Sequence, residues 1–483
     1  MLKQNGRDRG MTRRDSLKTT AAAFMILPAG LARGYAANEK MNIGVIGLNR
    51  GRSDTKALND LGENIAALCD VDSAILDRVG AEYPKAKKYT DFRKMIESEK
   101  LDGVVVATPD HNHAYISVWS MKHGIHVYCE KPLAQTIQEC RVMAKVAAET
   151  KVITQMGTSS TAEPRTLRTM EMVQSGVLGE ITEAHLSTDR PVWPQGFDRP
   201  GGEDAVPSTL NWDIWLGPAA VRPYQHVWPQ GHIVYTPEQR KKLPFNKGPQ
   251  VEVYHPFVWR GWTEFGSGAV GDIAPHHMNV IFMAMDLPAP SAVEVIQTSG
   301  MKKEMYPESS IVCFEWPQRG AHPPFKLYWY DGGNAPPDRI SAVSQLPPLK
   351  PGETVTPLRA GVGGLIWIGT KGSLPQNRGP YFGKSAEPYP VPPQRDWGRE
   401  DVYKDWVGGV RTGKQPSCNF SYSGPFTEAF QLANVALRVG HRVEWDPLAF
   451  RVTNCREADQ YLRREYRRGW DLKEISGSDA FRV

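Results

Sequence analysis

The sequence has few cysteines, six in 483 residues. They lie far apart, at positions 69, 129, 140, 313, 418 and 455. No two of them have the spacing of a redox pair or of a zinc site. We therefore expect neither a disulfide framework nor a bound metal.

The sequence also lacks an apolar run that would anchor the mature protein in a membrane. Residues 21–27 are apolar, but this run is much shorter than the ~20 residues that span a bilayer. Arg13 and Arg14 precede it, and small residues at 34–37 follow it. This order predicts a twin-arginine signal peptide over residues 1–36, export of the folded protein and a periplasmic location.

Outside this predicted signal the chain has no excess of charge. Residues 1–36 contain seven Lys and Arg but two Asp and Glu, and the remaining residues contain 51 of each class. The formal charge of +5 therefore belongs to the signal. The mature protein gives no electrostatic reason to expect a nucleic acid or an acidic membrane surface as a partner.

The length of the mature chain predicts two domains, because it exceeds what one hydrophobic core usually supports. The first begins with an apolar strand at 41–46 that ends in a glycine turn, Gly47 to Gly51. A helix and a second buried strand at 65–69 follow, and Asp70 closes that strand. This is the pattern of a dinucleotide-binding unit, in which the helix N-terminus receives the pyrophosphate and the acid receives the adenine ribose. An Asp at this place repels a 2′-phosphate, so the pattern favours NAD over NADP.

The glycine turn departs from the usual G-x-G-x-x-G, because Asn49 stands at the second glycine position. Asn tolerates a positive φ better than most residues, so this departure does not exclude the turn.

Strands and helices continue to alternate up to residue 158. Further buried strands are expected at 101–107, 126–129 and 152–157. Alternation of this kind predicts a doubly wound parallel sheet, a Rossmann domain over residues 41–158, with its ligands at the C-terminal strand ends. Thr108, Glu130, Lys131 and Gln155 follow such ends.

From residue 159 the pattern changes to apolar and polar residues in alternation, which indicates a half-buried antiparallel sheet. The expected strands are 180–187, 292–296, 311–316, 325–330 and 364–369. Long Pro- and Gly-rich loops at 190–260, 331–362 and 375–396 interrupt them, and helices are expected at 401–412, 425–440 and 457–469. We predict an α+β domain over residues 159–483 with a large, mostly antiparallel open sheet.

Three short motifs give the chain a family resemblance. They are Ala107-Thr108-Pro109 with His113, Glu130-Lys131-Pro132, and Gly271-Asp272 followed by His276. With these motifs the chain resembles the glucose–fructose oxidoreductase / inositol dehydrogenase family (Gfo/Idh/MocA). The stretches at 189–196 and 259–272 resemble an exported branch that acts on sugars.

The resemblance implies that the nicotinamide lies between Lys131 and the Asp272/His276 pair, where a sugar or polyol is oxidised or reduced. It also implies a homo-oligomer formed through the second sheet. Together, motif and resemblance predict a set of cofactor-binding residues. They are Gly47, Asn49, Arg50, Gly51, Asp70, Thr108, Pro109, His113, Glu130, Lys131 and Gln155.

The predicted catalytic residues are Lys131, Asp272 and His276. Asp272 and His276 are four positions apart, so on a helix they face the same way. Removal of hydride from an alcohol carbon needs a base for the hydroxyl proton, and His276 is suited to that role because an unperturbed His titrates near neutral pH. Asp272 could orient the imidazole, and Lys131 could stabilise the alkoxide or relay the proton.

Arg190, Trp193, Arg260 and His276 are candidates for binding the substrate. For Arg190, Trp193 and Arg260, packing at a surface or interface is an equal alternative. Fourteen tryptophans occur in the chain, several of them between positions 193 and 262, and their flat rings suit either sugar binding or a buried core.

Three functions are open at this point. The first is an NAD-dependent oxidoreductase acting on a secondary sugar hydroxyl, with C3 as one candidate, whose cofactor is loaded before export and recycled in place. The second is a glycosidase that uses NAD transiently, by oxidation, elimination, addition of water and reduction, as exported α-N-acetylgalactosaminidases of this superfamily do. The third is a non-catalytic sugar-binding protein on the same fold.

Overall fold

The computed structural model describes residues 40–338, 340, 364–375 and 392–481. The predicted signal peptide at residues 1–36, part of the 331–362 loop and most of the 375–396 loop lie outside the described residues.

The first domain is built on a six-stranded sheet in the order β3-β2-β1-β4-β5-β6. Every pair in it is parallel, as predicted. The strands are β1 (Asn42–Ile46), β2 (Asn64–Cys69), β3 (Lys87–Tyr89), β4 (Gly103–Val106), β5 (His126–Glu130) and β6 (Thr154–Gly157). The helices between them are α1 (Leu48–Asp60), α2 (Ser73–Gly80), α3 (Phe92–Ser98), α4 (Asp110–Lys122) and α5 (Ile137–Thr150).

Local sequence explains where these elements begin. Strands β4 and β5 are fully buried and rich in β-branched or aromatic residues, as expected for a sheet covered on both faces. Helix α5 starts with a capping box, in which the Thr136 hydroxyl accepts from the Glu139 N–H and the Glu139 carboxylate accepts from the Thr136 N–H.

The second domain contains an eight-stranded sheet in the order β12-β11-β7-β10-β9-β8-β13-β14. Its strands are β7 (Ile181–Ser187), β8 (Ala292–Thr298), β9 (Ser310–Trp316), β10 (Phe325–Tyr330), β11 (Gly364–Gly369), β12 (Ser373–Pro375), β13 (Val443–Asp446) and β14 (Arg451–Val452). Only the β7–β10 pair is parallel among the described strands of this sheet. The prediction of a mostly antiparallel sheet is therefore confirmed.

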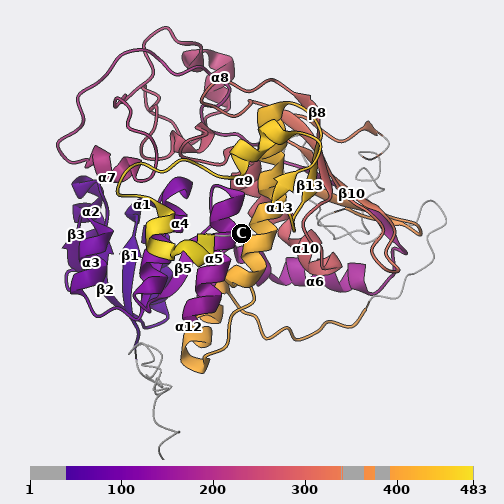
Figure 1. Cartoon of the computed structure of the whole chain (residues 1–483), viewed down its shortest axis with the longest axis horizontal. Coiled ribbons are helices and arrows are strands. Elements are labelled where there is room, and N and C mark those ends of the chain that lie inside the picture. Colours follow the sequence, from indigo (N-terminus) through magenta and orange to yellow (C-terminus); the bar gives the residue numbers. More distant parts are fainter. Residues whose placement is uncertain (1–39, 339, 341–363, 376–391, 482–483) are drawn as a thin grey trace, which may run out of the picture.

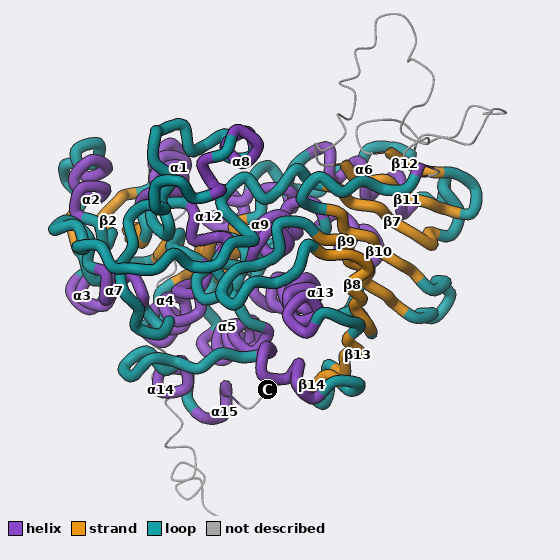
Figure 2. The backbone as a smooth tube through the Cα atoms, turned by 90° about the horizontal axis from the view of Figure 1, so that it is seen from above, coloured by secondary structure: helices purple, strands orange, loops and turns teal. Residues whose placement is uncertain are grey.

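One face of this sheet is covered by helices (Figure 2). Helix α13 (Phe420–Val439) contacts β8, and it also packs on α5 of the first domain and on α9 (Gly268–His277). Outside the long 190–260 loop, the other helices are η1 (Ser159–Thr161), α6 (Pro164–Gln174), α10 (Asn279–Met285), α12 (Val402–Thr412), η4 (Arg456–Leu462), α14 (Leu472–Ser476) and α15 (Ser478–Phe481). The two domains thus share a continuous hydrophobic core through α13.

Two predicted helices differ in the structure. Helix α13 begins at Phe420 rather than at 425, because the Asn419 side chain caps it by accepting from the Ser421 N–H. The predicted helix at 457–469 is wrong. It is a short 3₁₀ helix that ends at Leu462, since Ala458 and Leu462 are the residues of η4 that are buried and the arginine-rich sequence after them has no apolar stripe to pack.

The long loop of the second domain has a small core of its own. It contains α7 (Trp212–Leu216), η2 (Ile233–Tyr235), α8 (Pro237–Lys241) and η3 (Val258–Gly261). Trp215, Trp228, Tyr254 and Trp262 are buried together in it, so most of these aromatic rings pack rather than face solvent. Figure 1 shows this segment beyond one end of the first sheet, with α7 above α2 and α8 towards the second domain.

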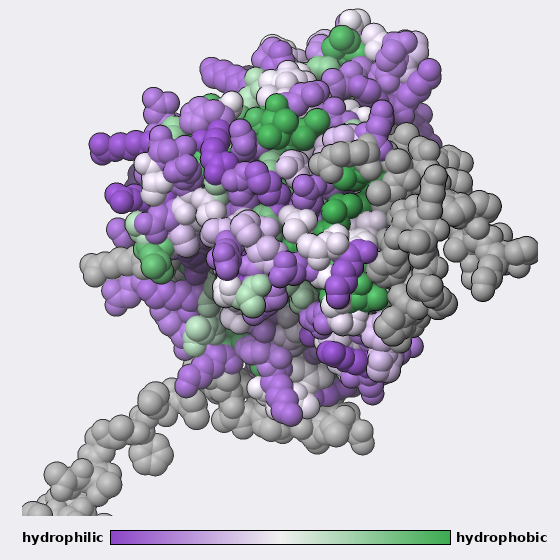
Figure 3. All heavy atoms as spheres, turned by 90° about the vertical axis from the view of Figure 1, so that its right-hand side faces the viewer, coloured by the Kyte–Doolittle hydropathy of each residue, from purple (hydrophilic) through white to green (hydrophobic). Residues whose placement is uncertain are grey.

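The surface on the side of the second sheet is mostly hydrophilic, with small apolar areas (Figure 3). Among the described residues, no helix is both long and apolar enough to cross a membrane.

Candidate active site

The turn after β1 is held against two neighbouring strands. Gly47 has a φ of +87°, which favours glycine, and its N–H donates to the Cys69 carbonyl at 2.9 Å. A Cβ at this position would lie 2.6 Å from the Ala107 carbonyl oxygen, so only glycine allows the turn to contact the end of β4. The Asp70 carboxylate accepts from the Leu48 N–H at 2.7 Å and so fixes the start of α1.

The turn forms without a positive φ at Asn49. Asn49 lies in the first turn of α1 and has a helical backbone, because Gly47 alone makes the reversal of the chain. The N–H groups of a first helical turn have no acceptor within the helix. Those of Asn49 and Arg50 are therefore suited to a pyrophosphate.

A cleft runs along the C-terminal strand ends of the first sheet. Six of the predicted cofactor residues line it: Gly47, Asn49, Arg50, Asp70, Thr108 and Pro109. Sequence reasoning missed the residues that close the cleft from the other side, among them Asn112, Trp215, His255, Trp259 and Trp470. Most of these come from the aromatic loop and the C-terminal segment, and the cluster of aromatics between 193 and 262 was the one available signal. The cleft has N–H groups suited to a pyrophosphate at the end of one strand and Asp70 at the end of the next, an arrangement that fits NAD.

The other predicted cofactor residues do not line the cleft but shape it. Gly51 lets α1 approach the sheet, since a Cβ there would lie 3.0 Å from Val45 Cγ1. His113 is buried, and its ring contacts the Pro132 carbonyl through Nδ1 (2.8 Å) and the Thr108 carbonyl through Nε2 (2.9 Å). Burial opposes protonation of this ring, but contact with Cys129 and the two carbonyls outweighs burial and raises its pKa to about 9. The protonated His113 ring thus connects two turns of the site by a hydrogen bond to each.

Glu130 holds Arg50 rather than a ligand. Arg50 bonds the Glu130 carboxylate at 2.9 Å and lies 3.3 Å from Asp54, whose carboxylate also accepts from the Tyr403 hydroxyl at 2.7 Å. Burial, and then the charge of Glu130, raises the pKa of Asp54 to about 7. Arg50 is half exposed, at 48%, so its guanidinium is anchored at one end and open to the cleft.

Gln155 is fully buried, and neither polar atom of its amide has a hydrogen-bond partner among the described residues. It pairs with Tyr128 across the sheet, so its side chain lies on the same face as Glu130. A buried amide without partners is costly. It therefore marks a place where a bound polar group would be stabilised.

The predicted catalytic residues meet where β5 ends against α9. Lys131 Nζ donates to Asp272 Oδ1 and to the Asp272 carbonyl, both at 2.8 Å, and each side chain is 13% exposed. Arg260 Nε approaches the same Oδ1 at 3.2 Å. Burial alone would raise the pKa of Asp272, but the charges of Lys131 and Arg260 hold it well below its usual range. Asp272 is therefore ionised.

His276 lies on the same helix as Asp272, as predicted, and the charges of Lys131 and Asp272 act on its ring. Burial, and then the nearby Lys131, lowers the pKa of His276 to about 3. The expectation of an ordinary His pKa is thus wrong, because the ring is buried beside a cation. Neither ring nitrogen bonds a described residue, so a neutral imidazole is available to a ligand. His277 follows it, with its ring 6.5 Å away.

Asp110 is a further carboxyl in this cluster that the sequence did not reveal. It begins α4 and is 3% exposed, close to Asp272, Lys131 and Arg260. Burial, and then repulsion by Asp272, raises its pKa to about 7. Below about pH 7, where Asp110 is mostly protonated while Asp272 is ionised, the two cations leave the cluster with one net positive charge, which favours a developing oxyanion.

The remaining substrate candidates are placed differently from one another. The Arg260 guanidinium packs over the Phe257 and Trp259 rings at 4.3 Å, lines the cleft and contacts Asp272. Arg190 pairs with its neighbour Asp189 and is close enough to His277 to lower the pKa of that ring. Trp193 is 2% exposed and its indole N–H donates to Gln195, so it packs beside Phe257 rather than presenting an open face.

Residues 41–158 match the model of a family described as an oxidoreductase family with an NAD-binding Rossmann fold, Gfo/Idh/MocA. The match covers this domain alone and identifies it as a Rossmann domain of the Gfo/Idh/MocA type. NAD is therefore the cofactor that this domain is built to bind.

Similar proteins include enzymes of carbohydrate chemistry. An α-N-acetylgalactosaminidase from Bacteroides fragilis is 34% identical over 129 residues, which cover 25% of this chain and 30% of that protein. A glycosyl hydrolase family 109 protein from Phocaeicola vulgatus is 33% identical over 156 residues, covering 30% and 37%. The matched region thus spans about a third of each relative.

The whole fold is similar to that of solved dehydrogenases. The WlbA dehydrogenase from Bordetella pertussis, in complex with NADH and UDP-GlcNAcA, has a TM-score of 0.56 and 15% identity. The superposition covers 84% of this chain and 99% of that one, so this likeness shows a shared two-domain fold.

We predict that Gly47→Ala purifies with much less NAD than the unchanged protein, because its Cβ would meet the Ala107 carbonyl. Bound nucleotide can be measured by mass spectrometry after denaturation. Gly62→Ala is a matched control: Gly62 also has a positive φ, +91°, but no described atom lies within 4 Å of its Cβ position. Equal NAD content in the two variants would show that the Gly47 contact is unimportant for binding.

A second prediction concerns Asp110→Asn and pH. The folded-state pKa of Asp110, about 7, is raised from a usual 3.8, so the stability contributed by the protonated form is complete below about pH 4 and is lost as the pH rises through 7. Asn keeps the neutral state, so the variant should gain melting temperature relative to the unchanged protein between pH 5 and pH 8. Thermal unfolding at both pH values tests this, with the exposed Asp60→Asn as control. A difference that does not change with pH would contradict the assignment.

Proposed function

We propose that the chain is an NAD-dependent oxidoreductase that acts on a secondary hydroxyl of a sugar or glycoside, with C3 as one candidate carbon. The observation that carries the proposal is the buried Lys131–Asp272 pair, with the unbonded His276 on the same helix. Arg260 both contacts Asp272 and lines the NAD cleft, so this pair adjoins the cofactor site.

The residues of the site can divide the chemistry among them. Bound NAD supplies the hydride acceptor. His276, whose pKa of about 3 keeps the free ring neutral, can accept the hydroxyl proton of the substrate. Lys131 and Arg260 stabilise the negative charge that develops on the substrate oxygen. Asp272 orients both cations, and it also favours transient protonation of the imidazole.

A second function, NAD-dependent glycosidic cleavage, is favoured by one observation. The curated relatives named above include an α-N-acetylgalactosaminidase, although the matched region covers about a third of its length. Cleavage through transient oxidation needs the same base and the same cofactor as net oxidation. The products separate the two functions: a keto-sugar with an intact linkage for the first, and a cleaved glycoside without net oxidation for the second.

The test is turnover of a panel of glycosides by protein that was never supplied with NAD. We expect Lys131→Ala to lower kcat by on the order of a hundredfold to a thousandfold, because the site loses one of the two cations that would stabilise the substrate oxygen, while bound NAD remains. Lys56→Ala, on the exposed face of α1, is the control. Unchanged turnover in Lys131→Ala would show that the catalytic centre lies elsewhere.

The location and assembly of the mature protein are also proposals. We infer that residues 1–36 are removed on export, that the protein carries NAD with it, because the periplasm has no free pool, and that it assembles through the second sheet. The face of that sheet opposite α13 supports the last point, since Tyr328 is part-buried there without a helix over it among the described elements. N-terminal sequencing, nucleotide analysis and light scattering of protein from the periplasmic fraction test these points. A monomer, an intact N-terminus or an empty site would each refute the corresponding point.

A further inference from the structure

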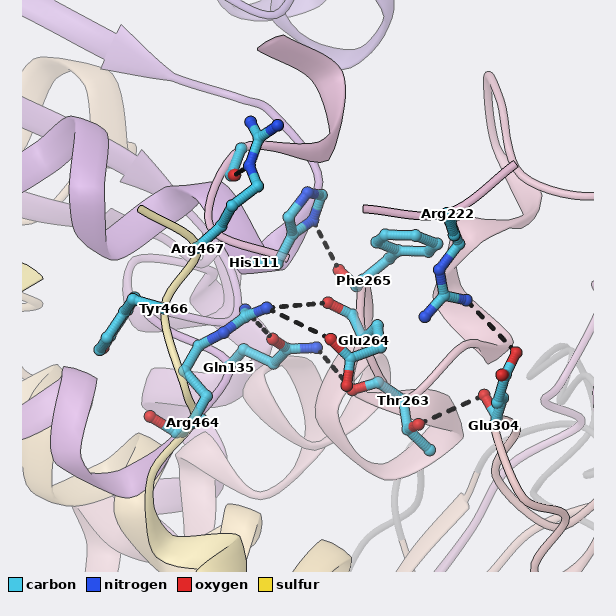
Figure 4. A network of polar contacts seen from close by, with 12 residues as sticks. His111, Gln135, Arg222, Thr263, Glu264, Phe265, Glu304, Arg464, Tyr466 and Arg467 are labelled. Atoms are coloured by element: carbon cyan, nitrogen blue, oxygen red, sulfur yellow. Dashed lines mark hydrogen bonds and ion pairs between the residues drawn. The ribbon is translucent and has the colours of Figure 1, made fainter. Parts of the chain in front are cut away.

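A second cavity, of about 460 Å³, lies apart from the NAD cleft. It is enclosed by α13, by the segment after Lys131 that contains Gln135, by Thr263 and Glu264, and by residues 460–467. It shares no lining residue with the cleft among the residues that the structure describes. Figure 4 shows part of its wall, where Arg464 points toward Gln135 and Glu264.

The cavity has more cations than anions in its lining. The lining contains four arginines but only two carboxylates: Arg438, Arg463, Arg464 and Arg467, and Glu264 and Glu465. Arg467 is paired with Asp213, and Arg464 lies 3.6 Å from the Glu264 carboxylate. Within the described part of the chain, Arg438 and Arg463 have no ion pair. Arg438 donates to the Thr263 carbonyl and Arg463 lies 5.2 Å from the Phe450 ring centre, so the contacts of both leave their positive charges without a carboxylate partner among the described residues.

Two buried polar atoms of the lining have no partner among the described residues. One is Nε of Arg464, a donor on a side chain that is 9% exposed. The other is Oδ1 of Asn434, an acceptor on a residue that is 5% exposed. The Asn434 Nδ2 already donates to the Ser267 carbonyl and to Gln431, so this oxygen is the free atom of the amide. The first needs an anionic or neutral acceptor, and the second needs a donor such as a hydroxyl.

Two of the three aromatic rings that line the cavity, those of Tyr306 and Tyr461, are already engaged by a cation. The Arg438 guanidinium lies 5.8 Å from the Tyr306 ring centre and 5.1 Å from that of Tyr461. These contacts hold the guanidinium at the cavity and occupy ring faces that a neutral sugar would otherwise stack on. The arrangement is better suited to a charged ligand than to a neutral one.

We propose that this cavity is a second ligand site, which binds a small hydroxylated oxyanion such as an acidic sugar. Arg438, Arg463 and Arg464 bind the carboxylate or phosphate, and Asn434 accepts from a hydroxyl. The site is independent of the proposed function. It nevertheless adjoins the catalytic helix, because Asn434 bonds Ser267 directly before α9, and Gln135 bonds the Thr263 and Gly266 carbonyls.

The test is calorimetric titration of the full-length, NAD-loaded protein with glucuronate, glucose, acetate and inorganic phosphate. Glucuronate carries both the anion and the hydroxyls, so we expect it to bind at least about tenfold more tightly than glucose or acetate, a difference of about 1.4 kcal/mol. Glucose 6-phosphate compared with inorganic phosphate repeats the comparison for a phosphate source.

Arg438→Gln and Arg463→Gln should each weaken glucuronate binding at least tenfold. Arg463 is exposed, so its variant remains informative if Arg438→Gln does not fold. Arg468→Gln is the matched control, since Arg468 is an exposed arginine of the same segment that does not line the cavity. Binding that survives both arginine variants, or that is lost in Lys131→Ala instead, would overturn the proposal, as would equal affinity for glucuronate and acetate or no binding at all.

Discussion

The ion pair between Lys131 and Asp272 is the contact on which the active site depends. It joins residues 141 positions apart, one at the end of a parallel strand and the other within a helix of the second domain. Both groups are largely buried, and loss of one partner of such a pair typically costs roughly 3–5 kcal/mol. The pair therefore fixes the distance between the two domains where the cofactor cleft ends. Together with burial, it also shifts the pKa values of Asp110 and His276 beside it.

The sequence was sufficient to predict the parts of the fold that follow from local patterns. Val104, Val105 and Val106 are all apolar, which predicts a strand buried on both faces. The run at 325–330 alternates, which predicts a strand buried on one face. The segment at 457–469 was mispredicted because its charge pattern permits a helix, while only Ala458 and Leu462 of the short 3₁₀ helix are buried and no apolar stripe follows them.

The candidate site was predictable only in part. Lys131, Asp272 and His276 belong to short motifs, so their types and spacing could be recognised. The role of Asp110 could not be predicted from a motif, because it depends on burial beside Asp272. Trp215 and His255, which form part of the cleft wall, belong to a loop whose folding depends on its own aromatic core. His113 was recognised as important, but it shapes the cleft rather than lining it, and a residue of either kind looks alike in sequence.

The doubly bonded imidazole of His113 has a consequence for alkaline conditions. Both ring nitrogens can donate only while the ring is protonated, and its pKa is about 9. At higher pH one carbonyl, of Thr108 or of Pro132, must lose its donor, so either the nucleotide side or the lysine side of the site loosens. For an enzyme that leaves the cytoplasm with one irreplaceable nucleotide, as proposed, such loosening would not be undone by a return to neutrality.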